Sequence, residues 1–354
     1  MKKSVCSRIK LTLALILITL LVIAIIKNST AGAKTIETQP KAINGVLDIR
    51  NWDFERDGVL KLDGQWLYYK EKLLYPDDFK NETNLEGENF KIPGSYGEHT
   101  YGTYRLKLLL NENIDLYTIN VDFVQSAYRL WANNKEIISV GIVGEDRSTM
   151  TPQLLPKKGY FHNEGKEMYI TLQVCNYYAK YGYIDNIHIG SMGQISAYEE
   201  KRLAFEMLLF GSTVLAAIYT LGLYLFRKKD KSALYLSIVC IIVAIRTLFL
   251  GGRFFIKVFP NFSYIVSGKI MHLTFYLYIP FILLFINSFY SGIISKRLVK
   301  ITNASIYLYS ILILLTPWKY YMDVIIPYQF LGLYILIYLV IKLSKSYLKN
   351  HGNE

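Results

Sequence analysis

Cysteine is scarce in this sequence, and its three copies, Cys6, Cys175 and Cys240, lie far apart. No pair has the close spacing of a zinc site, and Cys175 is alone in the region that we expect outside the cell, so no disulfide can form within that region. The His-Glu-x-x-His metal helix, the G-x-S-x-G elbow and the G-x-x-x-x-G-K phosphate loop are also missing. We therefore expect no catalytic activity, no metal and no cofactor.

Histidine and paired carboxylates offer no clearer site. The five histidines are scattered, at positions 99, 162, 188, 272 and 351, without the spacing of metal ligands. A glycosidase would need two carboxylates that face each other across a sugar. The sequence does not pair the acidic residues of one loop-like stretch, which are Asp77, Asp78, Glu86 and Glu88.

Negative charge is in the minority. The chain has 28 acidic residues against 40 lysines and arginines, a formal net charge of +12. Much of the excess lies in the first ten residues and in short loops between apolar runs. This distribution favours a role in membrane topology, with membrane lipid as a partner and no nucleic acid.

Long apolar runs, by contrast, are abundant in the second half of the chain. A bilayer core needs about 20 apolar residues per helix, and a backbone in lipid must satisfy its own hydrogen bonds. The sequence therefore predicts an α-helical polytopic membrane domain over residues 203–343 and a tail over 344–354. Its five predicted helices cover residues 203–226, 232–250, 270–290, 301–316 and 325–343.

The loops between these runs predict the orientation. Basic clusters follow the first, third and fifth runs, at 227–231, 296–300 and 342–349, and the alternate loops carry less charge. By the positive-inside rule these three ends are cytoplasmic. We expect a multi-pass protein of the cell membrane, with residues 34–202 extracytoplasmic and the C-terminus cytoplasmic.

The N-terminus carries a further apolar run. Four basic residues precede Leu11–Ile26, and Ala31-Gly32-Ala33 supplies small residues at the spacing of a cleavage site. Residues 1–33 are thus predicted to be a signal peptide, with an uncleaved N-terminal anchor as the alternative. Both alternatives place residue 34 outside.

Residues 40–195 have the mixed, alternating composition of an antiparallel all-β domain. In 103–110, Tyr104, Leu106, Leu108 and Leu110 fall on one face of a predicted strand, and 168–174 repeats the pattern. Asn133-Asn134 separates two further runs and suits a tight hairpin turn. We expect an extracytoplasmic β-sandwich.

Several short motifs resemble known families. Three of them resemble the sugar-binding jelly-roll domain of β-galactosidase-type glycoside hydrolases: Leu62-Asp63-Gly64-Gln65-Trp66, Ile92-Pro93-Gly94-Ser95-Tyr96 and Gly102-Thr103-Tyr104-Arg105. Other motifs, together with the five runs, extend the likeness over nearly all of the chain: Ser126–Trp131, Ala244-Ile245-Arg246, the Pro280 region and Pro327-Tyr328-Gln329. In this order the chain resembles the bacterial seven-transmembrane receptors with diverse intracellular signalling modules.

That resemblance implies a receptor with a galactose-binding-like jelly-roll ectodomain, seven helices and an intracellular output such as a histidine kinase, a diguanylate cyclase or a phosphatase. This chain departs from the pattern, because it has five runs and a short tail. We expect either a truncated reading frame or a signalling partner, such as a kinase or cyclase module, that acts in trans.

Two loops offer groups for a carbohydrate or similar small-molecule ligand, which flat rings and forked or amide donors suit. The candidate ligand contacts are Tyr96, His99 and Tyr101 in the first loop, Tyr177, Tyr178, Lys180 and Tyr183 in the second, and Arg105 and Arg129 on strands. The alternative is that the rings pack over the ends of the sandwich and the arginines are solvated. We expect Trp66 and Trp131 in the core.

In the membrane domain, Arg246 is the unusual residue, because a charge within a span is costly unless it is paired or reaches water. It either extends towards the interface or forms a structural or signalling pair, with Glu206 as a possible partner. Pro280 should kink its helix. Arg246, Glu206 and Pro280 are the candidate residues for coupling across the membrane.

These features predict a membrane sensor whose ectodomain binds a solute and biases two arrangements of the helices. The alternatives are a nonsignalling protein that binds sugar or wall polymer, and an accessory subunit of a transporter. Two further apolar runs and a kinase or cyclase in the adjacent coding sequence would favour the sensor. An intact neighbouring permease would favour the accessory subunit.

Overall fold

The computed structural model describes residues 39–81, 85–97, 100–110, 114–290 and 294–351. The predicted signal segment and His99 lie outside the described residues. The chain forms two compact units. We call Ile36–Met207 with Thr247–Gly268 the β unit, and Leu208–Arg246 with Lys269–Glu354 the main part of the helical unit.

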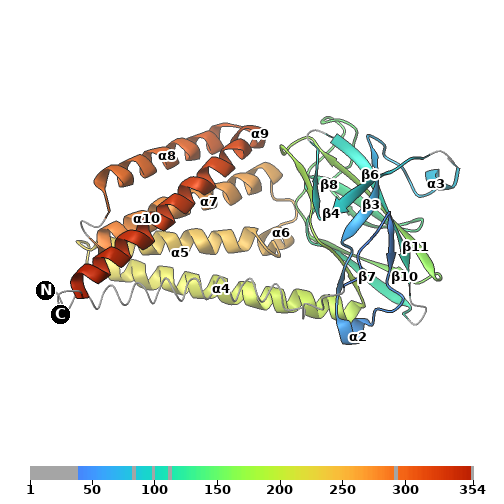
Figure 1. The fold of residues 1–354 in the computed structure, drawn as a ribbon, viewed down its shortest axis with the longest axis horizontal. Helices are drawn as coiled ribbons and strands as arrows, with labels where there is room; N and C mark the ends of the chain where they lie inside the picture. Colours follow the sequence, from blue (N-terminus) through green and yellow to red (C-terminus); the bar gives the residue numbers. More distant parts are fainter. Residues whose placement is uncertain (1–38, 82–84, 98–99, 111–113, 291–293, 352–354) are drawn as a thin grey trace. The chain divides into compact units, whose positions relative to one another are not determined.

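Two main sheets build the β unit (Figure 1). The larger sheet has, in spatial order, β4 (Glu88–Ile92), β3 (Gly64–Lys70), β6 (Thr100–Leu109), β11 (Glu167–Asn176), β8 (Ala127–Ala132) and β9 (Lys135–Val140), with β1 (Val46–Asp48) also paired to β6. The smaller sheet has β10 (Lys157–His162), β7 (Leu116–Val121), β13 (Ile187–Gly190) and β2 (Leu60–Lys61). A third pair joins β12 (Gly182–Ile184) to β5 (Gly94–Tyr96), and two short helices are α2 (Phe54–Asp57) and α3 (Asp78–Asn81).

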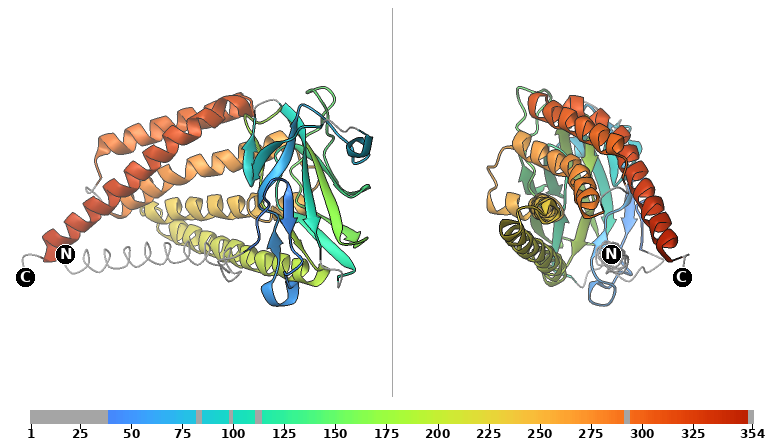
Figure 2. Two further views of the ribbon diagram at one scale, coloured as in Figure 1. Left: turned by 45° about the vertical axis from the view of Figure 1, so that its right-hand side comes forward. Right: turned by 90° about the vertical axis from the view of Figure 1, so that its left-hand side faces the viewer.

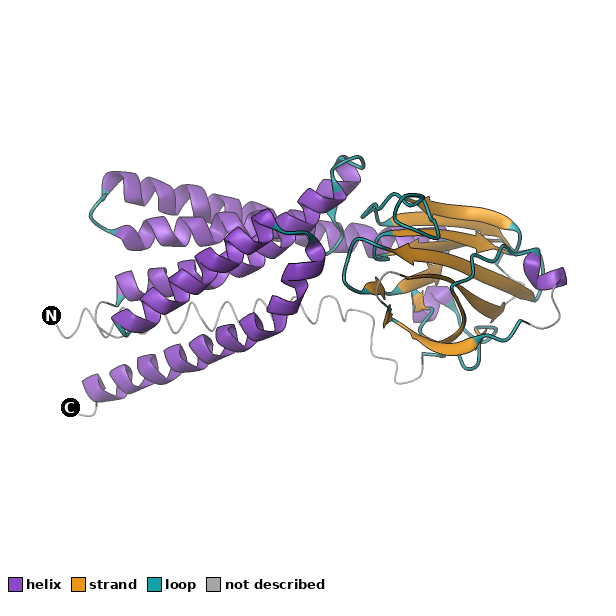
Figure 3. Ribbon diagram, turned by 90° about the horizontal axis from the view of Figure 1, so that it is seen from above, coloured by secondary structure: helices purple, strands orange, loops and turns teal. Residues whose placement is uncertain are grey.

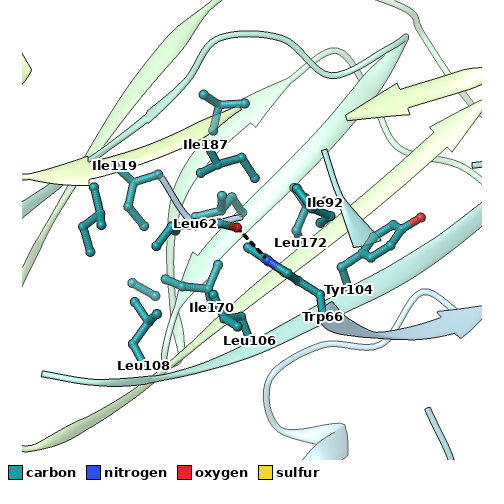
Figure 4. Close-up of a cluster of buried hydrophobic side chains, with 14 of the residues drawn as sticks. Leu62, Trp66, Ile92, Tyr104, Leu106, Leu108, Ile119, Ile170, Leu172 and Ile187 are labelled. Carbon is teal, nitrogen blue, oxygen red and sulfur yellow. Dashed lines mark hydrogen bonds between the residues drawn. The ribbon is translucent and has the colours of Figure 1, made fainter. Parts of the chain in front are cut away.

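One hydrophobic core receives side chains from both sheets (Figure 4). Leu106 and Leu108 of β6 are fully buried there with Ile119 of β7, which confirms the predicted alternation of β6. Burying a side chain of this size contributes about 1.5–3 kcal/mol. Trp66 is also in the core, as predicted, and its indole donates a hydrogen bond to the Leu62 carbonyl (2.9 Å).

The predicted hairpin is confirmed. β8 and β9 are antiparallel, and Ala132 pairs with Lys135 across the turn. Asn133 has a φ of 50°, a left-handed conformation that asparagine tolerates better than most residues. The turn therefore sets which side chains of the two strands share a face.

Long helices follow the last strand (Figure 3). They are α4 (Met192–Phe226), α5 (Lys231–Phe249), α7 (Tyr264–Phe289), α8 (Lys296–Leu315) and α10 (Ile325–His351), with the short elements α6 (Phe254–Val258), α9 (Trp318–Tyr321) and η1 (Met322–Val324) between them. Among the described residues, these five long helices are long and apolar enough to cross a membrane. The chain is a multi-pass membrane protein.

The helix α4 begins earlier than predicted. The apolar run starts at residue 203, but the helix starts at Met192. The added residues are polar and mixed, so hydropathy gave no reason to include them. Bonds from this stretch to other parts of the β unit, such as Arg202 to Asp122 and Glu199 to Lys158, explain why it is ordered as helix.

The helices of the helical unit run alongside one another (Figure 2). Hydrogen bonds and buried apolar side chains connect them. Ser237 of α5 donates to the Ala217 carbonyl of α4 (2.9 Å), and the Tyr328 hydroxyl of α10 donates to the Tyr276 carbonyl of α7. Large apolar side chains such as Leu315 (79% exposed) remain on the surface. An apolar surface of this kind is suited to lipid.

Candidate functional site

A cluster of charged residues joins three parts of the β unit: its strands, the first turns of α4 and the segment from the end of α5 to the start of α7. We call this cluster the junction. Its members are Asp122, Lys158, His188, Glu199, Arg202, Glu206, Gly252, Arg253 and Lys257.

Arg202 is at the centre of the junction. Its Nη1 donates to Asp122 Oδ1 (2.9 Å), and its Nε donates to Glu206 Oε1 (3.3 Å) one helical turn along α4. The three side chains are only 22%, 12% and 14% exposed, respectively. Burying charges is costly unless each is paired and hydrogen-bonded, so this cation and its two carboxylates depend on one another.

Glu206 also reaches the turn that follows α5. It accepts a hydrogen bond from the Gly252 backbone N–H (2.7 Å). Gly251 has a φ of +59°, and a Cβ added there would lie 2.2 Å from Glu206 Oε1. A side chain at position 251 would therefore displace the carboxylate, which gives this glycine a physical role.

Glu199 of α4 also connects two elements of the β unit, β10 and α6. Glu199 lies 2.6 Å from Lys158 Nζ of β10 and 2.9 Å from Lys257 Nζ of α6. Burial lowers the pKa of Lys158, but the hydrogen bond and charge of Glu199 outweigh it, so the net pKa is raised. The lysine is held in its charged form between two elements.

Arg253 is a half-buried cation of the junction. Its guanidinium lies 3.9 Å from the centre of the Phe123 ring, a cation–π contact, and burial lowers its pKa to about 10. Its Nη1 has no hydrogen-bond partner among the described residues. The residue adopts a left-handed φ of 53° at the start of α6.

His188 of β13 approaches the same carboxylate from the other side. Its Nδ1 lies 3.5 Å from Asp122 Oδ2, and its ring lies 5.0 Å from the Tyr198 ring of α4. The side chain is 3% exposed, and burial lowers its pKa below the ordinary value. The histidine is therefore held neutral beside Asp122.

The start of α7 is attached by neutral groups. The Tyr264 hydroxyl is hydrogen-bonded by the Gln125 amide and lies 3.2 Å from Ser126 Oγ. Gln153 donates to the Pro260 carbonyl (3.0 Å) in the same segment. The strands of the β unit and their loops thus bond the first turns of α4, the turn after α5 and the start of α7.

The first predicted ligand loop requires a correction. Tyr96 was expected on an exposed loop, but it is 1% exposed, and its hydroxyl donates to the Gln125 carbonyl (2.8 Å). The ring belongs to the core because β5 pairs with β12 and turns position 96 inward. Tyr101 is half-buried.

The second loop packs largely on its own surroundings. Tyr101, Tyr177 and Tyr178 lie against a small cluster formed by Ala127, Met150 and Cys175. The Tyr177 hydroxyl donates to the Glu145 carbonyl, and Arg147 lies 4.9 Å from the Tyr178 ring centre. Lys180 lies 5.2 Å from the Tyr181 ring centre, and Tyr183 is 39% exposed on β12.

The two predicted arginines have different surroundings. Arg129 lies 3.6 Å from Glu136 Oε2 and 6.0 Å from the Trp131 ring centre. Arg105 lies between two aromatic rings, those of Phe79 and Tyr169. Trp131 is buried (4% exposed), but it lies against Tyr75 and is not part of the core cluster in which it was expected.

Each of the membrane candidates is bonded within its own unit. Arg246 donates to the Met271 carbonyl of α7 (2.9 Å) and lies 5.2 Å from the Phe275 ring centre. Glu206 is bonded to Arg202 and Gly252, as described above. Arg246 thus takes a carbonyl and a ring as partners instead of a carboxylate. Pro280 lies inside α7.

Sequence reasoning missed most of the junction. Asp122, Arg202 and Arg253 carried no motif, and the bond between Asp122 and Arg202 joins positions 80 apart. One signal was available: positions 199, 202 and 206 fall on one face of a helix, which would have singled out a charged stripe before the first span. Among the described residues, no group of three or more His, Cys, Asp or Glu is placed to hold a metal ion.

Comparison with solved structures gives similarities of low extent. A β-glucuronidase from an uncultured Clostridium species is 17% identical with a TM-score of 0.28, over 37% of this chain and 28% of that chain. Ruminococcus gnavus β-glucuronidase is 10% identical with a TM-score of 0.27, over 37% of this chain and 27% of that chain. The GH2 β-galacturonidase from Eisenbergiella tayi bound to galacturonate is 12% identical with a TM-score of 0.25, over 37% of this chain and 24% of that chain. The chain thus spans less than a third of these proteins, and likenesses of this size establish no shared activity.

The membrane region gives a firmer match. No curated protein matches the chain. Residues 202–353, however, match the family described as "7TM diverse intracellular signalling". This region contains most of α4 and all of the later helices, together with Arg202, Glu206 and the turn at Gly252. The membrane region of this chain, residues 202–353, is therefore similar to the 7TM diverse intracellular signalling family.

Proposed function

We propose that this protein is a sensor of the bacterial cell envelope whose β unit binds a carbohydrate or a similar small solute and transmits the bound state to the membrane helices. In this proposal the β unit is a galactose-binding-like jelly-roll domain outside the membrane, and the C-terminus is cytoplasmic. The protein is a receptor and not an enzyme.

The observation that carries the proposal is the junction. Three segments connected to membrane helices are bonded to the β unit. Asp122 bonds Arg202 of α4, Glu199 of α4 bonds both Lys158 of β10 and Lys257 of α6, and Gln125 bonds Tyr264 at the start of α7. A shift of β7 or β13 would therefore move Arg202 and, through it, α4. A simple tether would need one flexible connection, whereas α4 and α6 are fixed by ion pairs and the start of α7 by neutral hydrogen bonds.

Transmission requires two states that bind the solute differently. In the junction, the alternatives are Arg202 bonded to both carboxylates and Arg202 bonded to only one of them. A partner in trans, such as a histidine kinase or diguanylate cyclase module, would read the resulting change in the helices, and anionic lipid would contact the basic loops.

The test uses the full chain in lipid nanodiscs and a panel of glucose, galactose, N-acetylglucosamine and galacturonate. We expect at least one sugar to raise the melting temperature and to slow hydrogen exchange at residues 192–207 and 247–268. Binding that leaves exchange in both segments unchanged would favour a nonsignalling sugar-binding protein. If no sugar in the panel binds the folded chain, the carbohydrate part of the proposal is wrong.

The orientation has its own test. A C-terminal tag should react with a membrane-impermeant reagent only after the cells are permeabilised, because the basic loops are expected inside. A tag inserted at the exposed Gly165 serves as the control and should react in intact cells. Reaction of the C-terminal tag in intact cells would contradict the proposed topology.

A further inference from the structure

A second site lies on the larger sheet of the β unit, away from the residues of the junction. It is a cavity of about 290 Å³, which we call the sheet-face pocket. Its lining residues are Asn44, Gly45, Val46, Leu67, Tyr69, Phe79, Leu85, Arg105, Lys107 and Tyr169. Ligand pockets commonly measure roughly 300–1,000 Å³, so this one suits a small solute.

Strand pairing explains why these residues meet. Arg105 of β6 is opposite Leu67 of β3, and Lys107 of β6 is opposite Tyr169 of β11. Side chains alternate along a strand, so Arg105 and Lys107 lie on the face opposite to Leu106 and the core. Phe79 reaches the same place from α3.

A tight turn beside β1 forms part of the pocket wall. Gly45 has a φ of +75°, and a Cβ added there would lie 2.6 Å from Leu67 Cγ. Any larger residue at position 45 would press on the apolar floor of the cavity. The floor that Leu67 forms thus depends on this glycine.

Arg105 is fixed between two rings. Its guanidinium carbon lies 3.7 Å from the centre of the Phe79 ring and 4.5 Å from that of Tyr169. Cation–π contacts of this kind do not use the N–H donors of the guanidinium, which can bond other partners. One donor nitrogen, Nη1, is buried and has no hydrogen-bond partner among the described residues.

The charge of the pocket has one sign. Its two charged lining residues, Arg105 and Lys107, are both cations, and none is a carboxylate. Lys107 has an outside partner, Glu167 (2.7 Å), which is 53% exposed. Elsewhere in the β unit, Arg50, Arg56 and Arg202 each have a carboxylate within 3 Å, and no such partner is found for Arg105 among the described residues. Burial lowers the pKa of Arg105, as expected for a desolvated cation without a carboxylate.

We infer that the sheet-face pocket binds a small ring solute that carries a carboxylate, such as an acidic sugar. Arg105 holds the carboxylate through its in-plane donors, since guanidinium and carboxylate match as a bidentate pair. The apolar side of the ring meets Leu67 and Tyr69, and Lys107 adds positive charge at the rim. This inference rests on the proposed function and names the class of solute that the β unit recognises.

The experiment is calorimetric titration of the full chain in detergent micelles with galacturonate, galactose and acetate. We expect galacturonate to bind at least tenfold more tightly than either galactose, which lacks the carboxylate, or acetate, which lacks the ring. Arg105→Gln should weaken the binding of galacturonate at least tenfold and abolish the preference of the protein for galacturonate over galactose. Arg56→Gln, at an exposed arginine outside the pocket, is the matched control and should retain the wild-type affinity.

Several outcomes would overturn the inference. Equal binding of galactose and galacturonate would remove the role of the carboxylate, while the proposed sugar sensor would stand. Acetate binding as tightly as galacturonate would remove the role of the ring. Binding of a neutral sugar alone would refute this inference only, whereas binding of no sugar at all would refute the carbohydrate part of the proposed function as well. The comparison of galactose with galacturonate on the wild type needs no variant. Arg105→Lys keeps the positive charge but loses the bidentate guanidinium, so its affinity for galacturonate should lie between those of the wild type and Arg105→Gln.

Discussion

The junction and the sheet-face pocket place arginine in two different environments of one unit. At the junction, Arg202 is matched by two carboxylates of its own chain. In the pocket, Arg105 is stacked between rings and has no carboxylate among the described residues. Arg202 therefore fastens elements of the unit together, whereas Arg105 lines a cavity and is available to a ligand. The two sites therefore suggest a division of labour between transmission and recognition.

The largest expected loss of stability comes from removing the ion pairs of Arg202. Arg202→Ala should destabilise the β unit by about 3–5 kcal/mol, because it leaves Asp122 and Glu206 as buried charges without their cation. The measurement is thermal unfolding of the full chain in detergent micelles. Arg50→Ala is the control: Arg50 also pairs with an aspartate, but it is exposed (58%), and its loss should shift the melting temperature little. Equal shifts for the two variants would show that the junction does not hold the unit together.

The turn at Gly251 comes next in size. Gly251→Ala should cost about 1–2 kcal/mol for the left-handed backbone, and more because the new Cβ would meet Glu206 Oε1 at 2.2 Å. The control is Gly58→Ala, since Gly58 has a φ of +80° but nothing within 4 Å of an added Cβ. The difference between their unfolding temperatures isolates the contact with the carboxylate. A larger loss for Gly58→Ala would contradict the proposed role of Gly251.

Acid should weaken the junction through His188, with a smaller effect. Burial lowers the pKa of His188 in the folded protein, so the unfolded chain takes up a proton first as the pH falls below about 6.5. The stability associated with neutral His188 is therefore fully present above that pH and is lost as the pH falls further. His188→Gln should flatten the melting temperature between pH 7 and pH 5, while His162→Gln, at an exposed histidine, should leave the slope as in the wild type. An unchanged slope in His188→Gln would exclude this histidine as the cause.

The smallest effect on stability is expected in the pocket. Arg105→Leu removes a desolvated cation with an unsatisfied donor, which offsets the loss of its stacking on Phe79 and Tyr169. Without ligand, its melting temperature should stay within about 4 °C of the wild type, a change of about 1 kcal/mol. Arg202→Leu provides the direct contrast and should unfold at a much lower temperature. If Arg105→Leu were as unstable as Arg202→Leu, the arginine of the pocket would be a structural residue.

Local patterns predicted much of the fold. The alternation in β6 and the turn at Asn133-Asn134 are confirmed, because a strand of period two and a left-handed turn depend on neighbouring residues. The apolar runs likewise predicted helices, since their length matches a bilayer. The start of α4 was missed because its first turns are ordered by contacts with the strands and not by hydropathy.

The candidate sites show where such reasoning ends. Sequence reasoning selected Arg105 and Arg129 alike, and only strand pairing placed Arg105 in a cavity and Arg129 beside Glu136. Tyr96 was expected to be exposed, and the pairing of β5 with β12 buried it. Glu206 accepts a hydrogen bond from Gly252, which lies 46 positions away along the chain, and no local pattern predicted this contact.

The sequence by itself determined that this chain enters a membrane and carries a β-rich region before its long helices, because hydropathy and strand periodicity are properties of consecutive residues. Only the tertiary structure decided which charges are paired. Asp122 and Arg202 are 80 positions apart and meet at 2.9 Å, and whether a cation finds a carboxylate at such a separation depends on the packing of the whole unit. For the same reason, the unmatched cation of the sheet-face pocket became visible only once the strands were in register.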